Sequence, residues 1–143
     1  MALAQKKLGT FYDYGIGVPQ DYKEAVKWYL LSAEQGIASA QFDLGRMYHS
    51  GNGVPQNYKE AIKRYRLSVE QENANAQRNL GLMYDKGEGV PQNYSLAHMW
   101  FNLASSNGNE IATKNRNSVE NKMSPSQIEK AQEMARNWKP KTN

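Results

Sequence analysis

Hydrophobic residues recur along this chain at the spacing expected of amphipathic helices. In the first segment, Ala4, Leu8, Phe11 and Tyr12 stand at positions i, i+4, i+7 and i+8, which places their side chains along one stripe of a helix. A second stripe begins after a short stretch that contains glycine and proline, and it consists of Tyr22, Ala25, Val26, Tyr29 and Ala33. The pattern therefore predicts two helices joined by a turn.

The predicted helix pair occurs three times, with a period of 36 residues. Val18, Val54 and Val90 are 36 residues apart in the segments GIGVPQDYKEA, GNGVPQNYKEA and GEGVPQNYSLA. Similarity at one fixed period is typical of stacked units that share a continuous core. The sequence therefore predicts an all-α fold, an α/α solenoid, and it favours binding over catalysis. The three repeats cover residues 2–37, 38–73 and 74–109.

The turn within each repeat carries signals of its own. Gly15 can adopt a positive φ angle and close the C-terminal end of the first helix. Asp21 can accept a hydrogen bond from a free amide of the second helix, and Glu24, three residues later, predicts a reciprocal capping box. The third repeat keeps the cap as Asn93 but has Leu96 in place of the glutamate, so we expect a weaker cap there.

Glycine also stands in the middle of the first helix of each repeat, as Gly9, Gly45 and Gly81. A glycine in a helix interior costs roughly 1 kcal/mol relative to alanine. A threefold repetition of that cost implies a packing requirement. We expect an aromatic ring of the partner helix to lie against the bare backbone, and a leucine at Gly45 to collapse the stack.

The repeat pattern ends after residue 109. Residues 110–123 start a fourth unit, but Arg116 stands where a leucine is expected and no glycine-rich loop follows. We therefore expect a degenerate repeat helix in residues 110–123, a capping helix in residues 124–139 and a tail in residues 140–143.

The signals for the capping helix are local. Ser124, Pro125 and Gln127 supply an N-cap, a proline in the first turn and a capping-box partner. Trp138 is expected to close the core of the last repeat, since terminal repeats need a lid with a polar outer face. Met1 directly precedes the first repeat and supplies no such lid, so we expect either a homodimer through the first repeat or a lid that lies upstream of the given chain.

The segments AQKKLGTFYDYGIGVPQDYKEAVKWYLLSAEQG, AQFDLGRMYHSGNGVPQNYKEAIKRYRLSVEQE and AQRNLGLMYDKGEGVPQNYSLAHMWFNLASSNG resemble Sel-1-like repeats, relatives of the tetratricopeptide repeat with longer loops. The closing MSPSQIEKAQEMARNW is similar to the helix that follows the last repeat in bacterial members. The resemblance implies a right-handed superhelix of antiparallel helix pairs. It also implies an adaptor or scaffold in protein complexes, without a conserved catalytic residue.

Length and composition agree with one domain over residues 1–143. The chain is 39% hydrophobic, and no apolar run approaches the roughly 20 residues that cross a bilayer. It enters the repeat pattern at Ala2 without the features of a signal peptide, so we expect either a cytoplasmic product or a periplasmic or secreted one whose leader was removed. The absence of cysteine excludes disulfides, thiolate metal sites and cysteine nucleophiles.

Partner-binding residues are expected at positions that vary between repeats, because the repeated positions are used in packing. On the first helix of each repeat, three such positions share one side, away from the core stripe. By analogy with related helical arrays, this side is expected to line a concave face, and its mixed chemistry suits a protein or peptide partner better than a small metabolite. Tyr14, Arg46 and Leu82 are the candidate anchors. The full set is Lys7, Thr10, Tyr14, Asp43, Arg46, Ser50, Asn79, Leu82 and Lys86.

The sequence predicts no cofactor, metal or catalytic site. The glycine pairs follow a helix rather than a strand and lack the Lys-Ser/Thr of a Walker motif, so we interpret them as turns. His49 and His98 occupy different repeat phases, which argues against a metal pair, and His98 falls at a core position. Neither GxSxG nor HExxH occurs. A cysteine-rich branch of the resembled family is linked to beta-lactam binding and hydrolysis, but this chain has none of those cysteines, which makes that activity the weakest alternative.

Charge does not indicate nucleic-acid binding. The net charge is +4, but 18 Lys and Arg residues are interleaved with 14 Asp and Glu residues and form no continuous stripe. The most basic stretch, Lys114, Arg116, Lys122, Lys139 and Lys141, favours an acidic partner. We therefore predict a non-catalytic scaffold or adaptor, envelope-associated or host-facing. The alternative is an immunity or accessory protein that neutralises a secreted effector.

Overall fold

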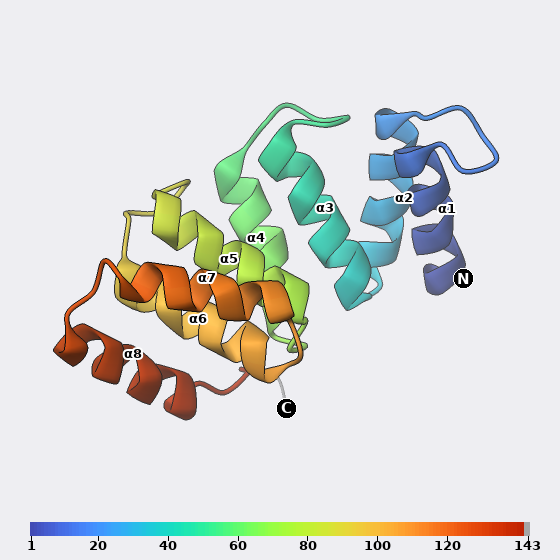
Figure 1. Ribbon diagram of the computed structural model, residues 1–143. Helices are drawn as coiled ribbons and strands as arrows, with labels where there is room; N and C mark the ends of the chain where they lie inside the picture. Colours follow the sequence, from blue (N-terminus) through green and yellow to red (C-terminus); the bar gives the residue numbers. More distant parts are fainter. Residues whose placement is uncertain (142–143) are drawn as a thin grey trace. The chain divides into compact units, whose positions relative to one another are not determined.

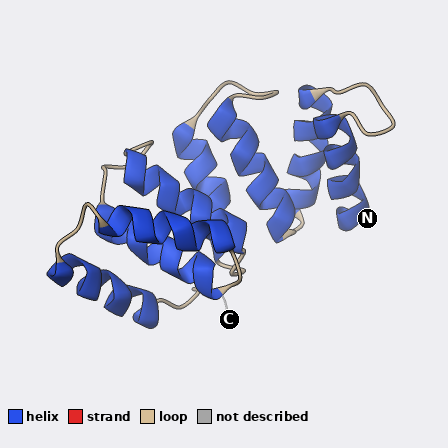
Figure 2. Cartoon of the chain, viewed as in Figure 1, coloured by secondary structure: helices blue, strands red, loops and turns tan. Residues whose placement is uncertain are grey.

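The computed structural model describes residues 1–141, and these residues form helices and loops without a strand (Figure 1; Figure 2). The predicted all-α class is confirmed. The helices in this part of the chain are α1 (Ala2–Tyr14), α2 (Tyr22–Glu34), α3 (Ala38–Ser50), α4 (Tyr58–Val69), α5 (Ala74–Lys86), α6 (Tyr94–Ser106), α7 (Glu110–Glu120) and α8 (Pro125–Asn137).

The chain forms two compact units. The first ends at Ser68 and the second begins at Val69, so the boundary lies in the last turn of α4, inside the second repeat. The single domain over residues 1–143 stays a prediction. Of the tail predicted for residues 140–143, Thr142 and Asn143 lie outside the described residues.

The first helix of every repeat ends at a glycine in the left-handed conformation. Gly15, Gly51 and Gly87 have φ angles of 67°, 76° and 70°. The backbone N–H of Gly51 donates to the carbonyl oxygen of Met47 at 2.8 Å. This geometry, which side chains with a Cβ rarely adopt, confirms the predicted helix ends.

The second helix of each repeat has the predicted N-cap but not the predicted capping box. Asp21 Oδ1 accepts a hydrogen bond from the backbone N–H of Glu24 at 3.2 Å, and no reciprocal bond from the Glu24 side chain forms. Instead, the backbone N–H of Asp21 donates to the carbonyl oxygen of Tyr12, at 2.9 Å, on the preceding helix. In the third repeat, the backbone N–H of Asn93 is bound in the same way, so a glutamate at position 96 would find no free amide there. The loss of a capping-box bond was the predicted reason for a weaker third cap, and that reason is wrong. The other repeats form the same hydrogen bond, from the backbone N–H of Asn57 to the carbonyl oxygen of Tyr48 and from that of Asn93 to the carbonyl oxygen of Tyr84.

Each mid-helix glycine lies against an aromatic ring, as predicted. In the first unit, a Cβ at Gly45 would lie 2.7 Å from Cδ1 of Tyr65. In the second unit, a Cβ at Gly81 would lie 2.7 Å from Cδ1 of Phe101. Real Cβ atoms essentially never approach so closely, so only glycine lets the two helices of a repeat meet at this distance.

The core of the first unit joins α2 to α3. Small alanines alternate with larger side chains in this cluster, and Tyr12, Tyr22 and Leu30 pack against it from the sides. The alternation lets neighbouring helices approach closely without leaving voids. The buried members are Ala25, Val26, Tyr29, Ala33, Ala40, Leu44 and Met47.

In the second unit, α6 contacts α5, α7 and α8. The sequence of α6, YSLAHMWFNLASS, has apolar residues on all sides, which is typical of a helix that is covered all round. Trp138 packs edge-on against Trp100, with ring centroids 5.5 Å apart, and this confirms its predicted role in closing the last repeat. The capping box of α8 is present as predicted, because Ser124 and Gln127 exchange both hydrogen bonds.

The degenerate fourth helix is α7, where Ala112 and Val119 remain buried. Arg116, at the position of the expected leucine, donates instead to the side-chain oxygen of Asn102 on α6 at 3.0 Å. Polar contacts thus replace part of the apolar core where the repeat pattern ends.

Candidate protein-interaction surface

The nine predicted partner-binding residues divide between the two units. Six lie on α1 and α3 in the first unit, and three lie on α5 in the second unit. The structure brings three of the first six, Tyr14, Asp43 and Arg46, into one network. A single concave face that carries all nine stays a prediction.

Tyr14 is the aromatic member of the first set, and 61% of its surface is accessible. The guanidinium carbon of Arg46 lies 5.9 Å from the centroid of the Tyr14 ring. A cation over a ring face at this distance is attracted by the quadrupole of the ring. The contact joins an exposed aromatic residue at the end of α1 to a cation of α3.

Arg46 is an internal partner rather than a free cation. Its Nη2 atom lies 2.6 Å from Oδ2 of Asp13 on α1 and 3.3 Å from Oδ1 of Asp43 on α3. Burial lowers the pKa of the Arg46 guanidinium, but the hydrogen bond to Asp13 and the negative charges of Asp43 and Asp13 outweigh burial and raise the pKa overall. The predicted anchor Arg46 therefore links α3 to α1 and positions Tyr14.

Asp13 is the functional residue that the repeat analysis missed. It is only 3% exposed, and its Oδ2 atom accepts hydrogen bonds from Arg46 and from the Tyr29 hydroxyl, the latter at 2.9 Å. Burial, together with the nearby carboxylates of Asp43 and Asp13, raises the pKa of the Tyr29 hydroxyl. The hydroxyl therefore stays protonated and acts as a donor.

Comparison of the repeats contains a signal for this partnership. In the second repeat, His49 stands at the position of Asp13, and its Nδ1 atom lies 3.4 Å from the hydroxyl of Tyr65. In the third repeat, Phe101 carries no hydroxyl, and the corresponding Asp85 lies 3.7 Å from the ammonium of Lys122. All three repeats have a polar residue at this position of the first helix, and in the first two repeats it contacts the tyrosine hydroxyl of the second helix.

Asp43 completes the network. Its Oδ2 atom lies 3.7 Å from the Lys6 ammonium on α1. Burial raises the pKa of the Asp43 carboxyl above its ordinary value, although the positive charges of Arg46 and Lys6 oppose the shift. The first unit thus brings together two carboxylates and two cations, whose formal charges balance, and one of these cations contacts the exposed Tyr14 ring.

The remaining members of the first set differ in availability. Lys7 is exposed, whereas Thr10 is half-buried and its hydroxyl donates to the carbonyl oxygen of Lys6 at 3.2 Å. The hydroxyl of Ser50 donates to the carbonyl oxygen of Arg46 in its own helix at 3.0 Å. Lys7 is therefore the residue of these three whose polar group faces solvent.

The second set lies along α5. Asn79 accepts a hydrogen bond from Arg78 at 3.5 Å, Leu82 is half-buried, and Lys86 is exposed in the last turn. This surface combines an aliphatic side chain with amide and ammonium groups. Such a mixture suits contact with another polypeptide.

His98 lies in the core of the second unit, as predicted, and is fully buried. Its Nε2 atom lies 2.8 Å from Oε2 of Glu120 on α7, a partner that the sequence did not reveal. Within residues 1–141, no group of three or more His, Cys, Asp or Glu side chains is arranged to hold a metal ion.

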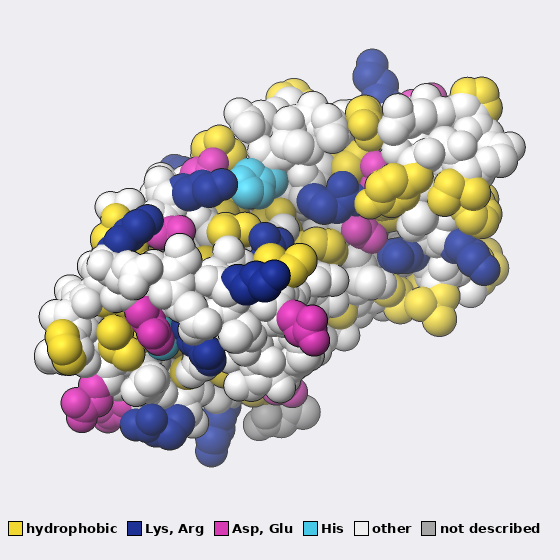
Figure 3. All heavy atoms as spheres, in the orientation of Figure 1, with side chains coloured by type: hydrophobic (Ala, Val, Ile, Leu, Met, Phe, Trp, Pro, Cys, Tyr) yellow, Lys and Arg dark blue, Asp and Glu magenta, His cyan; other side chains and the backbone are white. Residues whose placement is uncertain are grey.

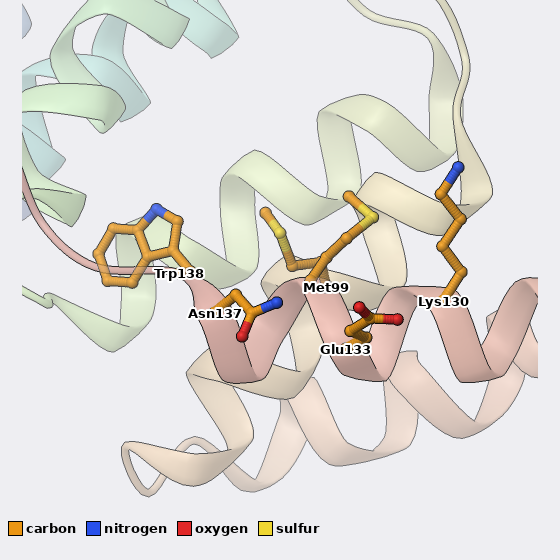
Figure 4. Close-up of a pocket in the computed structure, with 6 residues that line it drawn as sticks. Met99, Lys130, Glu133, Asn137 and Trp138 are labelled. Carbon is orange, nitrogen blue, oxygen red and sulfur yellow. The ribbon is translucent and has the colours of Figure 1, made fainter.

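An open cavity of about 390 Å³ lies beside α8 in the second unit. Its apolar lining comes from Met99, Met134 and Trp138, and Lys130 and Glu133 stand on its rim (Figure 4). No helix in the described part of the chain is both long enough and apolar enough to span a membrane.

Comparison with known proteins agrees with these features. The Sel1 repeat model matches residues 2–37, 38–73 and 74–109. Among curated proteins, none matches the sequence. The structure is similar to that of a Sel1 repeat protein from Oxalobacter formigenes, with 39% identity and a TM-score of 0.75 over 80% of this chain and 47% of the other.

A second similar structure is that of a protective antigen from uropathogenic Escherichia coli strains that displays an SLR fold. It is 41% identical, with a TM-score of 0.75 over 78% of this chain and 24% of the other. The chain therefore spans about half and about a quarter of the lengths of these two proteins.

Proposed function

The chain belongs to the Sel1 repeat family, and we propose that it is a non-catalytic scaffold or adaptor that binds a protein or peptide through the first helices of its repeats. Members of this family generally mediate protein–protein interactions. The observation that carries the proposal is the exposed Tyr14 ring, which lies against Arg46 beside a network of charged side chains.

The chemistry of this residue supports a role in binding. Aromatic side chains are enriched among residues that dominate binding energy. Leu82 offers an aliphatic contact on the second unit. The identity of the partner is proposed only as a polypeptide with an apolar or aromatic segment.

Affinity purification of the tagged chain from its native cells, followed by mass spectrometry, identifies the partner. A pull-down then compares the wild type with the double variant Tyr14→Ala and Leu82→Ala, which we expect to recover at least about tenfold less partner. Leu67→Ala is the matched control, since Leu67 is an exposed leucine on α4, outside the proposed surface. Undiminished recovery by the double variant contradicts the proposal.

Arg46 requires a different substitution. A glutamate there would place a third carboxylate beside Asp13 and Asp43 and would destabilise the unit whatever its role in binding. Arg46→Gln removes the charge while keeping a donor. We expect partner recovery to fall less than for Tyr14→Ala, because Arg46 acts through Tyr14.

Two settings for such an adaptor can be told apart. The similarity to a protective antigen of E. coli favours an envelope or host-facing role. Recovery of a secreted effector in the purification would instead favour an immunity or accessory protein. A homodimer through the first repeat and beta-lactam hydrolysis stay predictions from sequence.

A further inference from the structure

Two asparagines of the chain are followed directly by glycine. Asn52 and Gly53 lie in the loop between α3 and α4 (Figure 1), and Asn107 and Gly108 lie in the turn between α6 and α7. The asparagine of such a pair can lose its side-chain amide without an enzyme, because glycine has no side chain to shield its backbone nitrogen. The sequence alone makes both pairs candidates for this reaction, which is called deamidation.

Deamidation sets two requirements on the structure. The glycine nitrogen loses its proton and attacks Cγ of the asparagine, and the bond from Cγ to Nδ2 breaks as ammonia leaves. Water then opens the resulting succinimide ring at either carbonyl carbon, which gives aspartate or isoaspartate without an oxidant or a reductant. In isoaspartate the main chain is longer by one methylene group. The glycine N–H must therefore be free of hydrogen bonds, and the asparagine side chain must be free to turn.

Asn107 is exposed, but both of the reacting groups of its pair are bound. Its Nδ2 atom donates to Oε1 of Gln77 at 2.9 Å and to the carbonyl oxygen of Glu72 at 3.5 Å. The backbone N–H of Gly108 donates to the carbonyl oxygen of Ser105 at 3.0 Å. These groups become available only when the turn opens locally. The structure therefore protects the second pair.

At Asn52 the same groups are available. In the described part of the chain, neither the Asn52 side chain nor the backbone N–H of Gly53 forms a hydrogen bond, and both residues are half-buried. The backbone N–H of Asn52 donates to the carbonyl oxygen of Met47 at 3.0 Å, which places the residue just beyond the glycine that ends α3. The attacking nitrogen and the leaving amide are thus both free in the folded protein.

The loop that contains this pair packs closely on α2. A Cβ at Gly53 would lie 2.4 Å from the backbone oxygen of Tyr22 and 3.0 Å from Cγ2 of Val26, and the next residue, Val54, packs against the core of the first unit. An extra methylene group in the main chain would shift Gly53 in a place that has no spare room. A carboxylate alone fits the loop, since the third repeat has Glu88 at the position of Asn52.

We propose that Asn52 is a site of spontaneous deamidation in the folded protein, and that its isoaspartate product weakens the packing of the loop on α2. This contact joins the second repeat to the first, so the modification lowers the stability of the first unit as the protein ages. Conversion to aspartate leaves the contact intact. Neither Asn52 nor Gly53 belongs to the proposed binding surface, so deamidation is testable without a known partner.

The first test incubates the full chain in heavy-oxygen water at neutral pH and follows both pairs by peptide mass spectrometry. Opening of the succinimide incorporates the label, which separates new deamidation from any that preceded the incubation. We expect Asn52 to react at least about tenfold faster than Asn107 in the folded protein, because hydrogen bonds must first break at Asn107. In urea, the two rates should converge. Unlabelled Asn52, equal rates in the folded protein, or an unchanged ratio in urea overturns the proposal.

The second test measures the effect of the product on stability. Asn52→Gln is the matched control for ageing, since its longer side chain cannot close the same ring. We expect part of the aged wild type to unfold at lower urea concentration, in proportion to the isoaspartate at position 52, whereas aged Asn52→Gln unfolds like the fresh variant. Fresh Asn52→Asp should unfold like the fresh wild type. Isoaspartate-containing protein as stable as Asn52→Asp overturns the proposed effect on the loop.

Discussion

Residues at equivalent positions of the repeats show which side chains are structural and which are free for other uses. The ring of Tyr29, Tyr65 or Phe101 lies against a glycine in every repeat. The hydroxyl is different, because its partner changes from Asp13 to His49 and has no counterpart at Phe101. Packing against glycine thus requires an aromatic ring at this position, whereas the presence and the partner of the hydroxyl group vary between repeats.

Gly45→Ala should destabilise the protein, although alanine is the better helix former by about 1 kcal/mol. Its Cβ would lie 2.7 Å from the Tyr65 ring and 3.3 Å from the carbonyl oxygen of Ala61, and overpacking of this kind typically costs about 1–3 kcal/mol. The free energy of unfolding in urea measures the effect. Lys59→Ala, at an exposed position of α4, is the control and should change stability by less than about 0.5 kcal/mol. An unchanged or higher stability of Gly45→Ala would show that the ring does not require glycine.

Asp43 gives the protein a predictable response to pH. Its pKa is raised in the folded state, so the folded chain binds more protons than the unfolded chain between the ordinary pKa of about 3.9 and the raised value. Stability from this group therefore falls as pH rises through that window. We expect the free energy of unfolding of Asp43→Asn, minus that of the wild type, to increase with pH from about 4 upward and then to level off. A difference that decreases with pH over the same range would contradict the assigned direction.

At the scale of elements, the composition of a helix reflects how many neighbours cover it. α6 is apolar on all sides and contacts three other helices, whereas α4 has exposed charged residues such as Lys59 and Lys63. Met99 of α6 stands at the repeat position of Lys63, which lies 36 positions earlier. The replacement of lysine by methionine marks the place where α8 packs.

Trp138→Ala should loosen α8 selectively. The substitution removes the ring contact with Trp100 and leaves the capping box of Ser124 in place, so we expect a loss of about 2–4 kcal/mol in stability. Hydrogen exchange resolved by residue should accelerate most in α8. Arg136→Ala, at an exposed position of the same helix, should leave exchange in α8 unchanged, and uniform acceleration along the whole chain would show that α8 does not open as a separate element.

At the scale of the whole molecule, interleaved charge limits the partners. Several cations are bound to carboxylates, as in Arg46 with Asp13 and Lys122 with Asp85, and they offer little free charge to a polyanion. Figure 3 shows Lys and Arg side chains spread among acidic ones on the visible face.

Random-sequence duplex DNA should therefore bind weakly, without the steep salt dependence that results from neutralising many phosphates. Fluorescence anisotropy of labelled DNA at salt concentrations from about 50 to about 200 mM tests this expectation. A loss of affinity of about a thousandfold over this range would show a continuous phosphate-binding surface.

The sequence by itself determined the period, the helices, the glycine turns and the contact between each mid-helix glycine and its ring. These features are local or are repeated at one spacing, so each copy supports the interpretation of the others. The prediction of a capping box in the second helices was wrong because it relied on a local signal alone. Its signal is confined to four residues, whereas the amide of Asp21 binds the carbonyl oxygen of Tyr12 on another helix.

Only the tertiary structure decided which charged side chains pair with each other. It also decided which residues of the repeat core stripe are exposed in the first repeat. Asp13, Arg46 and Asp43 meet because α1 and α3 lie side by side, and no pattern within one helix states that distance. Leu8 and Leu44 are the same residue at the same repeat position, yet one is surface and the other is core. The difference depends on which helix lies opposite, and that is a property of the packed molecule rather than of the residue.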